Sequence, residues 1–143
     1  MIYLEKPKDF NPKLEAVGCF VQCNGEIALL LRQDHKPQGN TWGIPSGKVH
    51  EGENLAQTAI RETKEETGFN FSEEEMKFFK TVWVRFPEYD FVYHIFYADL
   101  DEKKEIRINS KEHKDAKWAS PFDVLKLPLI GDLDGCINLF FGI

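Results

Sequence analysis

The stretch that most constrains the fold is GKVHEGENLAQTAIRETKEETGF, residues 47–69, because it specifies one helix together with both of its ends. Asn54 is a helix-capping residue, and Gln57 three positions later completes a capping-box-like pair. Gly68 suits the position just past a helix end, where glycine adopts a left-handed conformation without strain. These signals predict a helix over residues 55–67. Small side chains on one of its faces would let it pack closely against a sheet.

Three glutamates share another face of that predicted helix. At about 100° per residue, Glu62, Glu65 and Glu66 fall within an arc of about 100°. Glu62 and Glu66 are four positions apart, and like charges at that spacing destabilise a helix by roughly 0.2–0.5 kcal/mol. A run of charge is usually a solvated face. The alternative is a bound cation, because Mg²⁺ takes carboxylate oxygens as ligands and would relieve the repulsion.

The composition is typical of a single soluble domain. With 143 residues and 42% hydrophobic content, one domain over residues 1–143 is expected. The net charge of −6 does not favour general nucleic-acid binding, which needs a basic stripe, although a bound metal can still recruit an acidic substrate. The three cysteines have no ligand spacing and are expected to be reduced thiols. No apolar segment is long enough for a signal core or a membrane span, so we expect a cytoplasmic protein without membrane association.

Apolar, β-prone runs predict strands before and after the glutamate helix. Residues 14–22 and 26–33 are joined by Asn24-Gly25, the strongest short hairpin signal, because both central positions of a type I′ turn need positive φ. The Gly-, Pro- and Asn-rich residues 34–47 are predicted to form a loop. Further strands are predicted over 77–86, 90–100 and 116–120, and further helices over 120–127 and 132–143. This order predicts an α/β layered domain with a mixed sheet.

The spacing of glycines and charged residues carries a more specific signal. The pattern G-x5-E-x7-R-E-x-x-E-E-x-G is formed by Gly47, Glu53, Arg61, Glu62, Glu65, Glu66 and Gly68. With each residue type near 7% usage, a chance match in a chain of this length is on the order of one in a million. Phe69 supplies the hydrophobic residue that closes the pattern. The segment resembles the signature of the MutT-like Nudix hydrolase family.

That resemblance implies a fold and an activity. The fold would be the α/β/α sandwich with a mixed β-sheet, formed by a single Nudix hydrolase domain over residues 1–143. The activity would be Mg²⁺-dependent hydrolysis, with Mn²⁺ as an alternative metal, of the pyrophosphate bond in a nucleoside diphosphate linked to another group. Water would attack phosphorus in a small-molecule substrate of nucleoside triphosphate or nucleotide-sugar type, and a homodimer is compatible with this function.

Two other functions stay open at this stage. One is a catalytically inactive nucleotide-binding module on the same fold, because fold alone does not fix activity. Its mark would be a damaged signature, and here every charged position is present. The other is an acidic surface helix in an unrelated interaction domain. That function would not require glycines, a glutamate and an arginine at fixed offsets from the helix.

The resemblance also assigns roles around the metal. Glu62, Glu65 and Glu66 would be the metal-binding and catalytic carboxylates, with Glu62 better placed as general base in some relatives. Ser46 would contribute its backbone carbonyl to the metal, although many relatives have a second glycine at this position. The substitution would leave the carbonyl in place and make the loop stiffer.

Other positions of the signature would serve its structure. Glu53 and the catalytic Arg61 would tie the loop to the helix and orient the first carboxylate. Gly47 would let the loop backbone turn tightly and approach the metal. Gly68 would end the helix, and Thr63 stands where an aliphatic residue is usual, with a similar shape.

Three residues outside the signature are candidates with a plainer alternative each. Glu112 resembles a segment that supplies one further metal-binding or base carboxylate in many relatives, or it is an ordinary residue of a charged loop. Trp42 would stack a nucleobase or anchor its loop against the core. Arg32, at a predicted strand end, would reach a substrate phosphate or simply be solvated. The four histidines show no ligand spacing and receive no role.

Overall fold

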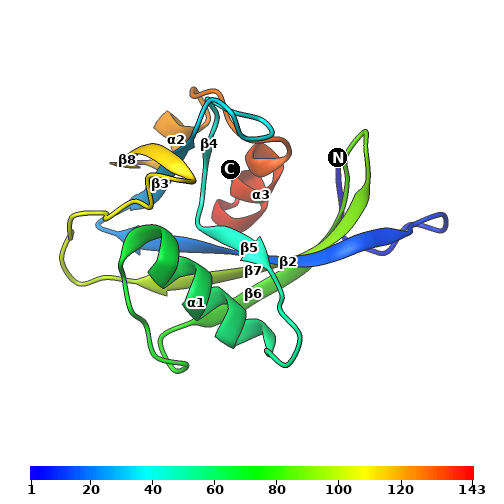
Figure 1. Ribbon diagram of the computed structural model, residues 1–143, viewed down its shortest axis with the longest axis horizontal. Helices are drawn as coiled ribbons and strands as arrows, with labels where there is room; N and C mark the ends of the chain where they lie inside the picture. Colours follow the sequence, from blue (N-terminus) through cyan, green and yellow to red (C-terminus); the bar gives the residue numbers. More distant parts are fainter.

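A single eight-stranded mixed sheet organises the protein, whose computed structural model describes residues 1–143 (Figure 1). The strand order is β1-β6-β7-β2-β3-β4, with β5 paired to β2 and β8 paired to β3. The strands are β1 Ile2–Tyr3, β2 Pro12–Cys23, β3 Glu26–Arg32, β4 Trp42–Gly43, β5 Ser46–Lys48, β6 Lys77–Arg85, β7 Asp90–Asp99 and β8 His113–Ala119. The helices are α1 Leu55–Thr67, α2 Pro121–Val124 and α3 Leu133–Phe141.

The centre of the sheet is the parallel pair of β2 and β7, which are in continuous register from Leu14↔Phe91 to Gln22↔Asp99, after an irregularity between Pro12 and Leu14. The other strand pairs are antiparallel. Because successive side chains of a strand point to opposite faces, the buried residues of β2 serve two different cores. Phe20 belongs to one apolar cluster, whereas Val17 and Val21 belong to the other.

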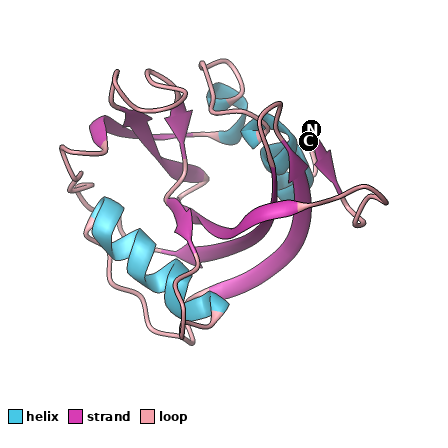
Figure 2. Ribbon diagram, turned by 45° about the vertical axis from the view of Figure 1, so that its right-hand side comes forward, coloured by secondary structure: helices cyan, strands magenta, loops and turns pink.

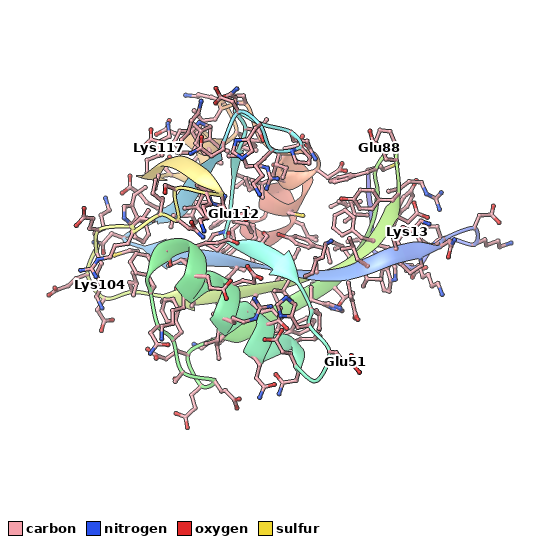
Figure 3. All side chains as sticks on the ribbon, in the orientation of Figure 1. Lys13, Glu51, Glu88, Lys104, Glu112 and Lys117 are labelled. Atoms are coloured by element: carbon pink, nitrogen blue, oxygen red, sulfur yellow. The ribbon has the colours of Figure 1, made fainter.

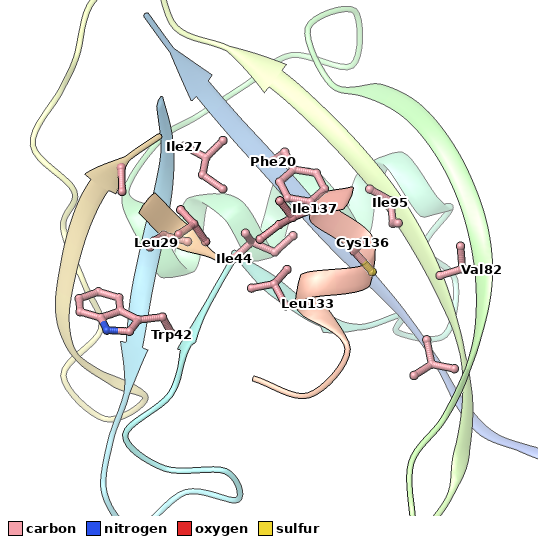
Figure 4. Packing of buried hydrophobic residues seen from close by; sticks show 13 residues of the cluster. Phe20, Ile27, Leu29, Trp42, Ile44, Val82, Ile95, Leu133, Cys136 and Ile137 are labelled. Carbon is pink, nitrogen blue, oxygen red and sulfur yellow. The ribbon is translucent and has the colours of Figure 1, made fainter. Parts of the chain in front are cut away.

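The helices cover the two faces of this sheet and make the predicted three-layer arrangement (Figure 2). The first cluster lies between the sheet and α3, where Phe20 stacks on Phe140 with ring centroids 4.6 Å apart and packs beside Ile137 (Figure 4). The second cluster joins the opposite face to α1 through Ala59. The observed layers confirm the predicted fold class, an α/β/α sandwich with a mixed sheet.

Local signals of the sequence agree with the observed turns and helix ends. Asn24 and Gly25 have φ of 50° and 78°, as the hairpin between β2 and β3 requires. Helix α1 begins after Asn54, whose side chain accepts a hydrogen bond from the Gln57 backbone while the Gln57 side chain accepts one from the Asn54 backbone. Gly68 ends the helix with φ of 82°.

Several elements differ from the expectation. Residues 34–47 are predicted to be a loop, but Trp42–Gly43 form β4, and Ser46 and Gly47 belong to β5. The short β1 was not predicted, and α2 ends at Val124 rather than at residue 127. None of the helices is both long enough and apolar enough to cross a lipid bilayer.

Candidate active site

Strand β5 and helix α1 bring the signature residues together beside the central strand. Gly47 pairs with Val17 of β2, and its backbone lies directly against the side chain of Glu62. A Cβ placed on Gly47 would lie 2.0 Å from Cδ of Glu62, where no real Cβ is found. The absence of a side chain at Gly47 therefore makes room for the close approach of a carboxylate, in addition to the expected tight turn.

Arg61 connects the signature loop to the helix. Its Nε lies 2.7 Å from Oε2 of Glu53, and its Nη2 donates to the backbone oxygen of Lys48 at 3.1 Å. Its Nη1 lies 2.7 Å from Oε1 of Glu62 and 3.4 Å from Oε2 of Glu65. The hydrogen bonds from Arg61 lower the pKa of Glu53 from 4.5 to about 2. Through these contacts Arg61 links the signature loop to α1 and holds the Glu62 carboxylate.

Glu66 and Glu62 form a carboxylate pair beside the loop. Glu66 is only 9% exposed and accepts a hydrogen bond from the backbone N–H of Ser46 at 3.2 Å. Burial, followed by the adjacent Glu62, raises the pKa of Glu66 well above its ordinary value. A buried carboxylate with a raised pKa next to a second carboxylate is a donor set that suits a hard divalent cation, whose charge offsets both effects.

Glu65 lies apart from this pair. Its side chain is 55% exposed and directed to Arg61 rather than toward Glu66. Accordingly, no three Asp, Glu, His or Cys side chains are gathered closely enough to enclose a metal ion by themselves. The residues present fit a cation held by Glu62 and Glu66 with further oxygens from backbone, water or substrate.

A cavity of about 700 Å³ opens in front of the Glu62–Glu66 pair. Its acidic wall consists of Ser46, Gly47, Glu62, Glu65 and Glu66. A second wall carries Arg32, Lys36, Asn109, Glu112 and His113. A third, largely apolar wall comes from β6, β7, the turn between them and the start of α3, and includes Val84, Phe86, Tyr89, Phe91, Tyr93 and Leu133. The cavity is therefore lined by carboxylates, by positively charged side chains and by aromatic rings.

The two charged candidates outside the signature both lie on the cavity. Arg32 ends β3, and its Nε donates to the backbone oxygen of Pro37 at 2.9 Å. Glu112 lies on the segment that leads into β8 (Figure 3), with Oε1 3.3 Å from Nζ of Lys36. Its negative charge adds to the larger effects of burial and of Glu62, which raise the pKa of Glu66.

The side chain of Trp42 lies in the core, where it cannot stack on a nucleobase in the cavity. It is only 8% exposed, belongs to the core cluster between the sheet and α3, and does not line the cavity. Lys117 lies over its ring at 4.6 Å from the centroid. The stacking hypothesis is corrected in favour of the plainer alternative, because β4 pairs with β3 and carries the ring inward.

Two residues of the cavity received no role from the sequence. His113 is buried, its Nδ1 has no hydrogen-bond partner, and burial followed by the charge of Arg32 lowers its pKa to about 4. Tyr93 reaches from β7 to the side chain of Ser46, with the two hydroxyl oxygens 2.8 Å apart. Its only sequence signal was its place in a β-prone run, which does not distinguish a site residue from a core residue.

Comparison with known proteins identifies the family. The sequence model of the NUDIX domain matches residues 12–138, and the chain therefore belongs to that family. A stretch of 78 residues is 47% identical to the m7GpppN-mRNA hydrolase dcap-2 of Caenorhabditis elegans, covering 52% of this chain and 10% of that protein.

Two solved structures agree with this assignment. The NUDIX domain of Shewanella oneidensis NrtR, solved with ADP ribose, superposes with a TM-score of 0.77 at 26% identity, over 96% of this chain and 92% of that one. A bifunctional NMN adenylyltransferase/ADP ribose pyrophosphatase from Francisella tularensis, solved with AMP and a Mn ion, gives a TM-score of 0.75 at 25% identity. That match covers 94% of this chain and 42% of the Francisella chain. The chain thus spans only a part of dcap-2 and of the Francisella protein.

Proposed function

We propose that this chain is a Mg²⁺-dependent pyrophosphohydrolase, with Mn²⁺ as an alternative metal, acting on a nucleoside diphosphate linked to another group. The observation that carries the proposal is the Glu62–Glu66 pair on the wall of a 700 Å³ cavity, with Arg61 locked between Glu53 and Glu62. A solvated acidic helix would have no reason to bury Glu66. The Mn ion in the Francisella neighbour supports a divalent metal.

The charged residues around the carboxylate pair have the following tasks in this proposal. Glu62 and Glu66 hold the cation, Glu65 supplies a further carboxylate from the edge of the cavity, and Arg61 holds Glu62 against Gly47. When bound, the metal neutralises the diphosphate, polarises the P–O bond that breaks and acidifies water. Glu62 accepts the proton of the attacking water. Glu112 is a secondary base or metal-binding carboxylate, because it lies across the cavity, where it is paired with Lys36.

The remaining walls fit the two ends of such a substrate. Arg32 and Lys36 place positive charge on the cavity wall, where phosphate oxygens would be bound. The rings of Phe86, Tyr89 and Phe91 lie 5.0–5.9 Å apart and offer an apolar surface to a flat base. ADP ribose and AMP in the two structural neighbours support a nucleotide-containing substrate.

The test is a panel of nucleoside triphosphates and nucleoside diphosphate derivatives, assayed with Mg²⁺, with identification of the products. We expect cleavage at a pyrophosphate bond, abolished by a chelator and restored by added Mg²⁺. The variant Glu62→Gln serves as the catalytic control, because it keeps the shape of the side chain and removes its charge. Full activity after exhaustive chelation would overturn the proposal. Nucleotide binding without turnover would instead identify a catalytically inactive binding module.

A further inference from the structure

Ser46 is held from two sides at the edge of the carboxylate pair. Its backbone N–H donates to Oε1 of Glu66 at 3.2 Å, and its Oγ lies 2.8 Å from the hydroxyl oxygen of Tyr93. The Ser46 hydroxyl already donates its one proton to the backbone oxygen of Ile44 at 3.0 Å. The Tyr93 hydroxyl is therefore the donor in the bond between the two side chains.

The space for this bond is built into the central strands. Ser46 pairs with Gly18 of β2, and the Tyr93 hydroxyl lies directly over that glycine. A Cβ on Gly18 would lie 1.8 Å from the Tyr93 oxygen, so any larger residue would displace the ring.

The position of Ser46 determines the position of its neighbours in the site. The next residue is Gly47, against which the Glu62 carboxylate packs, and the Ser46 N–H contacts Glu66. Strand β5 has only three residues, Ser46–Lys48. A side-chain anchor on Ser46 thus restrains the short backbone segment, Ser46 and Gly47, that contacts both carboxylates of the pair.

We propose that Tyr93 is a positioning residue for the metal site. It acts through Ser46, holding the β5 backbone against Glu62 and Glu66, and does not itself contact the reacting atoms. This inference rests on the proposed function, because it assumes that the carboxylate pair binds a divalent cation. A tyrosine that only fills the core would be replaced by phenylalanine without consequence for metal binding.

The test is direct Mn²⁺ binding, by calorimetry or electron paramagnetic resonance, to the parent and to Tyr93→Phe. The variant keeps the ring and removes the donor. We expect the Mn²⁺ dissociation constant to rise by about fivefold to tenfold, the range for loss of one net hydrogen bond. The metal concentration for half-maximal activity should rise equally, whereas turnover at saturating metal should stay within about twofold. Tyr97→Phe is the matched control, because Tyr97 lies on β7 and packs on Phe140.

A second variant separates positioning from a packing defect. Ser46→Ala removes the other partner of the hydrogen bond from a partly buried position. It should weaken Mn²⁺ binding to the same extent, with no further loss when both changes are combined. If Tyr93→Phe does not fold, Ser46→Ala carries the test alone. Parent-like Mn²⁺ affinity in either variant, or fully additive losses, would overturn the inference and leave the proposed function intact. A parent that binds no Mn²⁺ would overturn both.

Discussion

Gly47→Ala tests the central contact of the site with the smallest change that the chain allows. The added Cβ would lie 2.0 Å from Cδ of Glu62, whereas real Cβ atoms keep about 3.0 Å from their neighbours, so the carboxyl group or the strand must move by about 1 Å. Gly47 does not have a positive φ, and the backbone itself accepts alanine. The whole effect therefore comes from displacing Glu62.

The magnitude follows from that displacement. A misplacement of about 1 Å in a catalytic group costs on the order of a hundredfold in rate. Glu62 cannot evade the methyl group freely, because its Oε1 is held 2.7 Å from Arg61 and its side chain is only 13% exposed. We expect turnover to fall about a hundredfold while the far-ultraviolet circular dichroism of the protein stays unchanged.

The assay is steady-state kinetics at saturating metal, with Gly43→Ala as the control. Gly43 also lines the cavity, but a Cβ there would meet only Cγ2 of Ile130 at 3.4 Å, an ordinary contact. Turnover of Gly43→Ala should stay within about threefold of the parent, because the added Cβ would displace no carboxylate of the site. Parent-like turnover in Gly47→Ala would refute the argument that Glu62 must lie against this glycine.

Three further outcomes are expected. Glu66→Gln should lower turnover by at least about a hundredfold, and Glu65→Gln should lower it by less. The reason is that Glu66 is nearly buried beside the cavity, whereas Glu65 is 55% exposed. Equal losses in the two variants would contradict this ranking. Glu112→Gln should lower turnover by roughly a hundredfold with little change in substrate affinity, and unaltered kinetics would remove it from the site. The Arg61 hydrogen bonds lower the pKa of Glu53 from 4.5 to about 2, so the stability that they contribute is present above pH 4.5 and lost as pH falls through about 2. Glu53→Gln should thus be less stable than the parent at neutral pH, with the difference shrinking in acid denaturation below pH 4.5 and vanishing near pH 2.

Features set by neighbouring residues could be predicted from the chain alone. The ends of α1 and the turn between β2 and β3 depend on caps and positive φ values, which involve residues at most a few positions apart. The same holds for the arc of glutamates on α1, because helical geometry converts spacing directly into direction. The offsets of Gly47 and Glu53 from that arc were sufficient to identify the family.

Tertiary structure decided which of those residues meet. Glu65 and Glu66 are adjacent in the chain, yet only Glu66 lies against Ser46, because β5 covers that side of the helix. Trp42 stands in a polar, glycine-rich segment that resembles a loop, and its burial depends on pairing with β3 across ten intervening residues. Tyr93 reaches Ser46 across 47 positions of sequence and over Gly18. Such contacts depend on strand register and on space left by distant residues, and no local pattern of the chain encodes either one.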